Sequence, residues 1–219
     1  VLSARPADLE KLTVEALDDN GVPQHEWVEP KAFGELLTCD FKIIAEKDTP
    51  KQSREGHRVA LVISDFYTRW IDAFPSKTRE TDEVYYALRE FLGPEGKANC
   101  IYSDNAPEII AASKELGAFA PTCTPHIAQT NGCAENCVRK VTEATSCALT
   151  QSGFSFQWWS SAMRCACFLR NATDVMHYGR TPYFERFGEP FMGKLVPFGA
   201  EVGYLRFTRE AKCDRVHPL

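Results

Sequence analysis

Three acidic residues occupy positions where carboxylates could perform chemistry. Asp40 lies inside the apolar run LLTCDFKII, Asp104 ends the run CIYSD, and Glu135 lies in the first turns of an expected long helix. A charge within an apolar strand is costly to bury unless it is paired or bound to a metal. If the strands that carry Asp40 and Asp104 are neighbours, their carboxylates project close together. An oxygen-only site of this kind suits Mg²⁺ or Mn²⁺ rather than zinc.

From spacing alone, each acid could have a structural role rather than a catalytic one. A strand aspartate is often a satisfied structural residue, and Glu135 could be a solvated helix carboxylate that pairs with Arg139 at i+4. No His–Ser or His–Cys nucleophile pattern competes with the acids, because the five histidines lie in polar or loop contexts. The nine cysteines contain no C-x-x-C pair, which favours reduced core thiols in an intracellular protein. Metal binding by Cys133 and Cys137, at i and i+4, remains a minor alternative.

The elements that would position the acids follow from apolar periodicity and turn residues. Segments 35–44, 58–66 and 69–75 predict three strands of an antiparallel meander, with Pro75 closing the third. A helix is expected next, with Thr81 as its cap and Gly93 as its stop. The later elements are expected as a strand at 98–104, a short helix around 107–117, an apolar run at 118–125, a long helix at 131–151 and a last helix after Gly153, capped by Ser155.

This order of elements predicts an α/β fold. A helix between the meander and the strand at 98–104 implies a right-handed crossover and a parallel addition to the sheet. The expected architecture is a mixed sheet, part antiparallel and part parallel, flanked by helices. Many chemistries occur on such folds, so the order alone does not decide function.

The net charge of −5 first argues against nucleic acid as a partner, but its distribution removes that argument. Residues 1–35 hold eight acids against three bases, and the remaining 184 residues hold 22 of each sign. The acidic lead-in, with Pro and few large apolar residues, predicts a linker or weakly ordered segment. No apolar run is long enough to span a bilayer and no leader pattern opens the chain, so we expect neither a membrane nor a secreted protein. A chain that starts at Val1 is expected to be an excised or processed fragment.

Local strings around the three acids resemble the integrases of retroviruses and LTR retrotransposons. SDNAPEI is similar to their S-D-N-G-x-E-F string, and TPHIAQTNGCAEN is similar to their T-P-x-x-x-x-x-N-G-x-x-E segment. FGELLTCDF resembles the strand that bears the first Asp, and ISDFYTRWIDAFPSKTRET resembles the family's D-x-x-S-R-x-x-x-x-x-P-x-K-x-K segment. The stretch from FQWW to VGYL resembles copia-type elements. The resemblance runs from about Phe33 to Leu205. It implies the RNase H-like fold of an integrase catalytic core.

The resemblance also implies a catalytic triad and a reaction. Asp40, Asp104 and Glu135 match its D, D and E, which would hold two Mg²⁺ or Mn²⁺ ions. The implied reaction is DNA integration by polynucleotidyl transfer, in which water trims a DNA 3′ end and the freed hydroxyl attacks a target phosphodiester. The implied partners are DNA and further copies of the chain, and the implied location is intracellular, in the nucleus.

DNA contacts are expected around the same site. Arg139 and Lys140 lie about one turn beyond Glu135, where they could contact DNA phosphates. The alternative for Arg139 is a helix-surface charge paired with Glu135. His126 and Gln129 could touch backbone or base edges from the preceding loop. Gln129, Asn131 and Gly132 match the family's loop before the third acid.

Departures from the family pattern leave other functions open. Ala106 replaces the usual Gly after S-D-N, Ile109 replaces an aromatic residue, and the stretch between Asp104 and Glu135 is a few residues short. The usual zinc module and a terminal β-barrel are not visible. An inactive transposon-derived DNA-binding relic and an RNase H-like nuclease are therefore the alternatives. The expected domains are an acidic lead-in at 1–32, a catalytic core at 33–175 and a post-core extension at 176–219.

Overall fold

The structure is a computed structural model of the 219-residue chain. It describes residues 30–45, 51–120, 132–176 and 179–203, together with the backbone of two short strands at 13–17 and 23–27.

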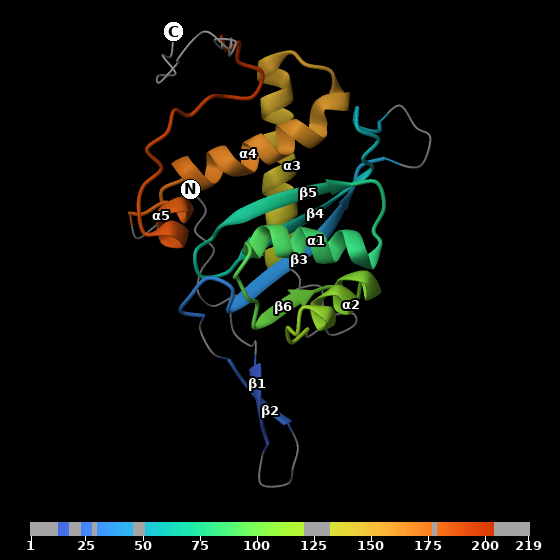
Figure 1. Ribbon diagram of the computed structural model, residues 1–219, viewed down its shortest axis with the longest axis vertical. Helices are drawn as coiled ribbons and strands as arrows, with labels where there is room; N and C mark the ends of the chain where they lie inside the picture. The colour runs from blue at the N-terminus through green and yellow to red at the C-terminus, as the bar shows by residue number, and fades with distance from the viewer. Residues whose placement is uncertain are drawn as a thin grey trace, which may run out of the picture.

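A four-stranded mixed sheet forms the centre of the molecule (Figure 1). Its strands are β3 (Leu36–Ile43), β4 (Val59–Asp65), β5 (Ile71–Ser76) and β6 (Cys100–Ser103), in the spatial order β5-β4-β3-β6. The pairs β3–β4 and β4–β5 are antiparallel, and β6 adds to β3 in parallel. The predicted meander and the predicted parallel addition are both confirmed.

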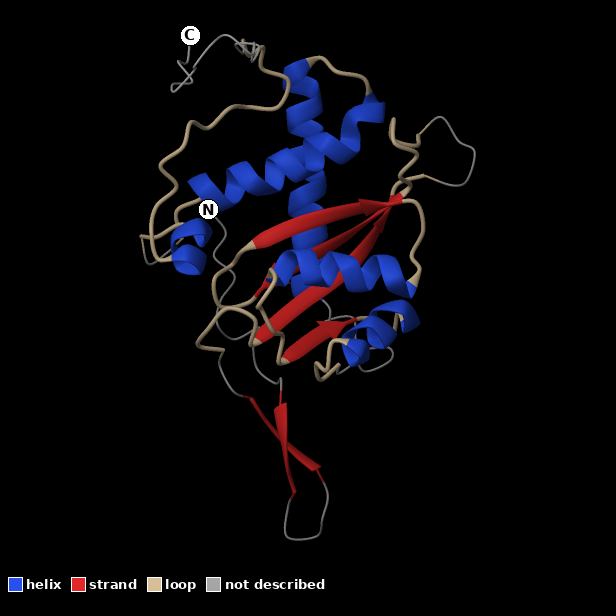
Figure 2. Ribbon diagram, in the orientation of Figure 1, coloured by secondary structure: helices blue, strands red, loops and turns tan. Residues whose placement is uncertain are grey.

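Helices cover both faces of the sheet (Figure 2). Helices α1 (Thr81–Leu92) and α2 (Pro107–Glu115) pack on one face, where Leu37, Cys39 and Ile63 belong to their apolar core. Helices α3 (Gly132–Ser152) and α4 (Trp159–Thr173) pack on the other, after the short 3₁₀ helix η3 (Phe156–Trp158). Because side chains alternate between the faces of a strand, the even-numbered residues of β3, Asp40 among them, point toward α3 and α4.

Several details differ from the sequence expectations. Strand β5 continues through Pro75 to Ser76, which an edge strand tolerates because one row of its N–H groups has no partner strand. Thr81 is the first residue of α1 rather than its cap; Glu80 holds the cap position without a side-chain hydrogen bond. Ser155 likewise caps the 3₁₀ helix rather than α4, and without a side-chain hydrogen bond.

The lead-in contains regular structure that the sequence did not predict. Strands β1 (Thr13–Leu17) and β2 (Pro23–Trp27) pair antiparallel, with Thr13 opposite Trp27. The lead-in, which was expected to be a linker or a weakly ordered segment, therefore contains a pair of strands. TVEAL and PQHEW contain few large apolar residues, so neither has the apolar run by which the other strands were predicted.

A short helix beyond the expected core boundary packs onto the core. This helix, α5 (Pro182–Phe187), starts at Thr181, whose side chain accepts a hydrogen bond from the Phe184 N–H. Its Arg186 donates a 2.6 Å hydrogen bond to the Phe91 carbonyl and lies 4.3–4.5 Å from the ring centres of Phe33 and Trp70. The domain boundaries at 32 and 175 stay predictions. Among the described helices, none has the length and apolar character needed to cross a membrane.

Candidate active site

The strand register brings Asp40 and Asp104 side by side. Strands β3 and β6 pair in parallel with Cys39 opposite Ser103, so the next residues in register are Asp40 and Asp104. Neighbouring strands lie about 5 Å apart. Two residues separated by 63 others in sequence thus meet at one end of β6, as the sequence predicted from neighbouring strands.

The negative charges of both other acids of the predicted triad affect the pKa of Asp40. Burial raises the pKa of the Asp40 carboxyl to about 6, the hydrogen bond from the Phe41 N–H opposes that rise, and the negative charges of Asp104 and Glu135 add to it. The Phe41 N–H lies 2.7 Å from Asp40 Oδ1. The three carboxylates are therefore near enough for their charges to interact at Asp40.

Asp104 organises the start of α2. Its Oδ1 accepts a 3.1 Å hydrogen bond from the N–H of Ala106, which caps the helix. Ala106 has φ −68° and ψ 112°, a conformation open to any residue, so Ala in place of the family's Gly strains nothing. Ile109, in place of an aromatic residue, is completely buried in the core under α2. Neither departure disturbs the site.

Helix α3 presents Glu135 at the sheet through contacts on its buried side. Ala134 and Val141 are buried, and the thiol of Cys137 makes hydrogen bonds with Cys133 and with Ser64 of β4. The Cys133 hydrogen bond is the largest of the effects that lower the pKa of the Cys137 thiol. Glu135 itself is exposed at the edge of this buried side. The helix is thus fixed to the sheet beside its acid.

The three carboxylates provide the type of ligand atom that a hard divalent cation prefers. Asp40, Asp104 and Glu135 offer only oxygen atoms, and their mutual repulsion at Asp40 is what a cation would relieve. Over the described ranges, no three Asp, Glu, His or Cys side chains already stand as a ligand cluster. This also leaves the alternative of metal binding by Cys133 and Cys137 without a third ligand among these residues.

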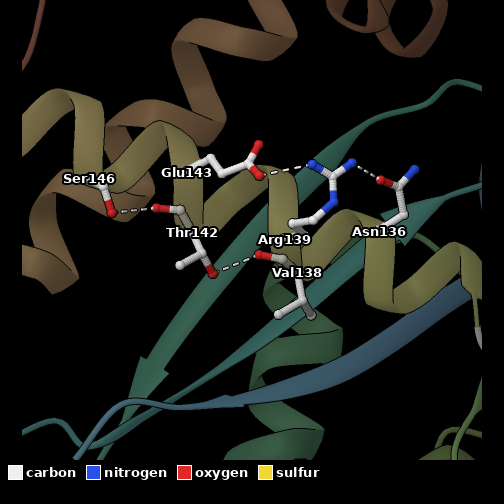
Figure 3. Close-up of polar contacts among 6 residues, drawn as sticks. All are labelled: Asn136, Val138, Arg139, Thr142, Glu143 and Ser146. Atoms are coloured by element: carbon white, nitrogen blue, oxygen red, sulfur yellow. Dashed lines mark hydrogen bonds and ion pairs between the residues drawn. The ribbon is translucent and has the colours of Figure 1, made fainter. Parts of the chain in front are cut away.

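Arg139 is engaged by partners other than Glu135 (Figure 3). Its guanidinium contacts Glu143 Oε1 at 2.8 Å and Asn136 Oδ1 at 2.7 Å. The pairing with Glu135 that the sequence left open is not the one formed. Glu135 therefore keeps its carboxylate free of Arg139.

The remaining predicted DNA contacts are placed only in part. At about 100° per residue, Arg139 lies about 40° around α3 from Glu135, whereas Lys140 lies about 140° from it. Gly132 is the exposed first residue of α3. His126, Gln129 and Asn131 lie outside the described residues.

Sequence reasoning gave no role to several residues that build this region. Asn171 of α4 holds the edge strand, accepting from the Ile71 N–H at 3.0 Å and donating to the Ile71 carbonyl at 2.7 Å. Arg69 has a φ of 61°, the one positive value recorded for a non-glycine residue in the described part of the chain. An asparagine within an apolar helix is a signal for the first. The second falls on the Arg of the family's D-x-x-S-R string, a match for which no role was predicted from the sequence.

Comparisons with known proteins agree with this fold. No protein-family model matches the chain. The Gag-Pol polyproteins of woolly monkey sarcoma virus and koala retrovirus are 27% and 29% identical over 146 and 147 residues, 64% of this chain and 8% of each polyprotein. The chain therefore spans less than a tenth of the length of these relatives.

Solved structures share the architecture at low sequence identity. The HTLV-2 integrase catalytic core domain in complex with magnesium matches with a TM-score of 0.54 and 15% identity, over 71% of this chain and 97% of that one. A chain of the simian T-cell lymphotropic virus intasome in complex with the PP2A regulatory subunit B56 gamma matches with a TM-score of 0.60 and 14% identity, over 90% of this chain and 67% of that one. The fold is the RNase H-like fold of integrase catalytic cores, and the similarity is to proteins of retroviral type.

Proposed function

We propose that this chain is the catalytic core of a DNA integrase, a polynucleotidyl transferase that processes DNA 3′ ends and joins them to target DNA. The observation that carries the proposal is the meeting of Asp40 and Asp104 across β3 and β6, with the charge of Glu135 acting on Asp40. The integrase-core fold and the Gag-Pol similarity support it.

Asp40, Asp104 and Glu135 would hold Mg²⁺ or Mn²⁺, in a two-ion arrangement. The bound metal supplies activation of the attacking oxygen and charge stabilisation of the leaving oxygen in an in-line displacement. The magnesium in the HTLV-2 core domain supports this choice of cation. Asp40, whose pKa both other acids raise, would hold the cations together with Asp104 and Glu135.

The chain's own residues set the conditions for that reaction. Because its pKa is about 6, Asp40 is mostly ionised at neutral pH and is available as a ligand. The hydrogen bonds of Cys137 and Asp104 fix α3 and α2 around the acids, so the carboxylates are positioned by rigid elements. Arg139 and Lys140 are proposed DNA phosphate contacts, with Gly132, His126, Gln129 and Asn131 beside them.

The assembly and source of the chain are part of the same proposal. DNA and further copies of the chain are the proposed partners, supported by the dimeric and trimeric forms of the HTLV-2 core and by the simian intasome. The nucleus is the proposed location. Origin from a copia-type element, rather than from a retrovirus, rests on the sequence resemblance alone.

The test is strand transfer in reverse on a pre-branched DNA, with Mn²⁺ and low salt. The purified chain should resolve the branch, and Asp40→Asn, Asp104→Asn and Glu135→Gln should each lower the rate by about 10³-fold or more. Asp82→Asn, an exposed acid of α1, is the matched control and should keep the wild-type rate. Near-wild-type turnover in any triad variant would refute the assignment.

The same preparation separates the alternatives. We expect these 219 residues on their own to resolve branches and to fail at paired insertion of two DNA ends. Cleavage of RNA in an RNA–DNA hybrid, without branch resolution, would indicate a nuclease. A folded chain that binds metal and is inactive on every substrate would indicate a relic.

A further inference from the structure

Three cations surround the side of α3 that faces away from Glu135. Arg69 and Lys140 both act on the Cys133 thiol, opposing the rise in its pKa that the Cys137 hydrogen bond and burial cause. Lys140 and Arg170 both help to lower the pKa of the Cys137 thiol. Each of the three charges therefore acts on one or both thiols of this pair.

This cationic flank, defined as Arg69, Lys140 and Arg170, is separate from the carboxylate site. At about 100° per residue, Lys140 lies about 20° around α3 from Cys133 and about 140° from Glu135. Arg139, by contrast, lies on the Glu135 side. One helix thus carries an acid-bearing side and a cationic side.

The fold holds the flank together from three elements. Arg69 ends the β4–β5 turn, where the Asp65 N–H donates to the Trp70 carbonyl at 2.8 Å. Two residues further on, Ile71 is joined to α4 by two hydrogen bonds with Asn171, the residue that directly follows Arg170. The contact between Ser64 and Cys137 fixes α3, and with it Lys140, to the same end of β4.

Two of the three cations keep their charge available. Arg170 is paired with Asp174 at 3.1 Å. Among the residues placed in the structure, no ion pair is formed by Arg69 or Lys140. Arg69 stacks 4.4 Å from the centre of the Phe66 ring, which leaves the edge of its guanidinium for another partner.

The backbone at Arg69 gives a second indication. A residue with a side chain at φ 61° is strained relative to glycine at the same place. A strained residue that carries a charge with no ion-pair partner in the described chain, beside a catalytic helix, is more readily explained by binding than by stability.

We propose that the cationic flank binds DNA backbone phosphates, as a second contact surface distinct from the DNA held at the carboxylates. The inference rests on the proposed integrase function and extends it, because joining two DNA segments requires both to be held at once. Guanidinium and ammonium groups from three elements suit phosphate without reading sequence. The flank therefore contributes affinity rather than base specificity.

The test compares the salt dependence of DNA binding among charge variants, measured with a branched duplex and Ca²⁺ so that no turnover occurs. Arg69→Gly removes the charge and suits the positive φ, so the variant should fold at least as stably as the wild type. Arg69→Gly and Lys140→Ala should each reduce the slope of log affinity against log salt by about one unit. Arg69→Lys should restore the slope, and Lys114→Ala, an exposed cation of α2, should leave it unchanged.

A charge-swap at Cys133 provides an independent measurement. This cysteine is exposed between Arg69 and Lys140, so it can be labelled with methanethiosulfonates of similar size and opposite charge. In a Cys137→Ser and Cys147→Ser background, which removes the thiol of lower pKa and the other exposed one, the negative sulfonate label should weaken DNA binding severalfold more than the positive trimethylammonium label. The difference should vanish in Cys133→Ser.

The outcomes separate the inference from the function beneath it. If Arg69→Gly and Lys140→Ala bind as Lys114→Ala does, or both labels act equally, the flank is not a DNA surface, even when Glu135→Gln still abolishes branch resolution. If Glu135→Gln resolves branches normally, the proposed function fails, whatever the slopes are.

Discussion

Two aspartates on neighbouring strands, Asp65 of β4 and Asp40 of β3, have opposite kinds of surroundings. Burial raises the pKa of both carboxyls. Asp65 is completely buried and accepts hydrogen bonds from the Gly34 N–H at 2.9 Å, the Thr68 N–H at 2.7 Å and the Thr68 hydroxyl at 2.6 Å. Asp40 is half-buried, accepts from the adjacent Phe41 N–H, and faces two further acids.

The difference separates a structural carboxylate from a functional one. Three donors satisfy Asp65, so it closes the β4–β5 turn and ties it to the chain before β3. Asp40 is held by burial and by two neighbouring negative charges, against which it has the single hydrogen bond from the Phe41 N–H. Carboxylates kept in such surroundings at the end of a sheet are candidates for metal binding and catalysis.

The largest effect on stability is expected at the structural aspartate. Asp65→Ala leaves three donors without their acceptor, two of them backbone N–H groups, and should lower the free energy of unfolding by about 3–5 kcal/mol. Urea unfolding followed by circular dichroism measures it. A loss below about 1 kcal/mol would remove the distinction between the two aspartates.

Removing Arg186, whose positive charge acts on Asp65, should have the next largest effect on the free energy of unfolding. Arg186 lowers the pKa of Asp65, and its guanidinium lies against Phe33 and Trp70 while donating to the Phe91 carbonyl. Arg186→Ala should cost about 2–3 kcal/mol of unfolding free energy, because it removes a charged hydrogen bond and stacked contacts. Removing the exposed Arg180 in the same way should cost less than 0.5 kcal/mol.

Replacing Asp40, the functional aspartate, should change the free energy of unfolding by a small amount and in the opposite direction. Without metal, Asp40→Asn should raise the free energy of unfolding by about 1 kcal/mol at pH 7–8, after allowance for solvent screening of a half-buried group. The gain should decline as pH falls through about 6 and vanish below about 4, because the wild-type carboxyl is then protonated in both states. Unfolding in EDTA at several pH values measures it, and a stability loss at pH 8 would assign Asp40 a structural role.

The sequence predicted the sheet well because its signals there are local. The apolar runs with turn residues between them identified the meander, and the helix between strands identified the parallel addition that joins Asp40 to Asp104. The hairpin of β1 and β2 was missed because its strands carry no apolar run.

The roles of individual charged residues depended on contacts that the sequence does not reveal. By their apolar pattern, LLTCD and VALVISD both predict strands that carry an aspartate. The donors that satisfy Asp65, Gly34 from the chain before β3 and Thr68 from the following turn, become visible only in the fold. Arg139 has a glutamate four residues away on each side, and the folded helix pairs it with Glu143. Arg69 was overlooked because its positive φ and its approach to α3 arise from the β4–β5 turn.

Direct measurement of Mn²⁺ binding tests the central claim that Asp40, Asp104 and Glu135 form one divalent-cation site. Bound Mn²⁺ would be counted from the loss of free-ion electron paramagnetic resonance signal in titrations of the wild-type chain, Asp40→Asn and Asp82→Asn at pH 7.5. The account predicts saturable binding by the wild type and by Asp82→Asn, and loss of that binding in Asp40→Asn with the fold intact. Equal Mn²⁺ binding by Asp40→Asn and the wild type would contradict it.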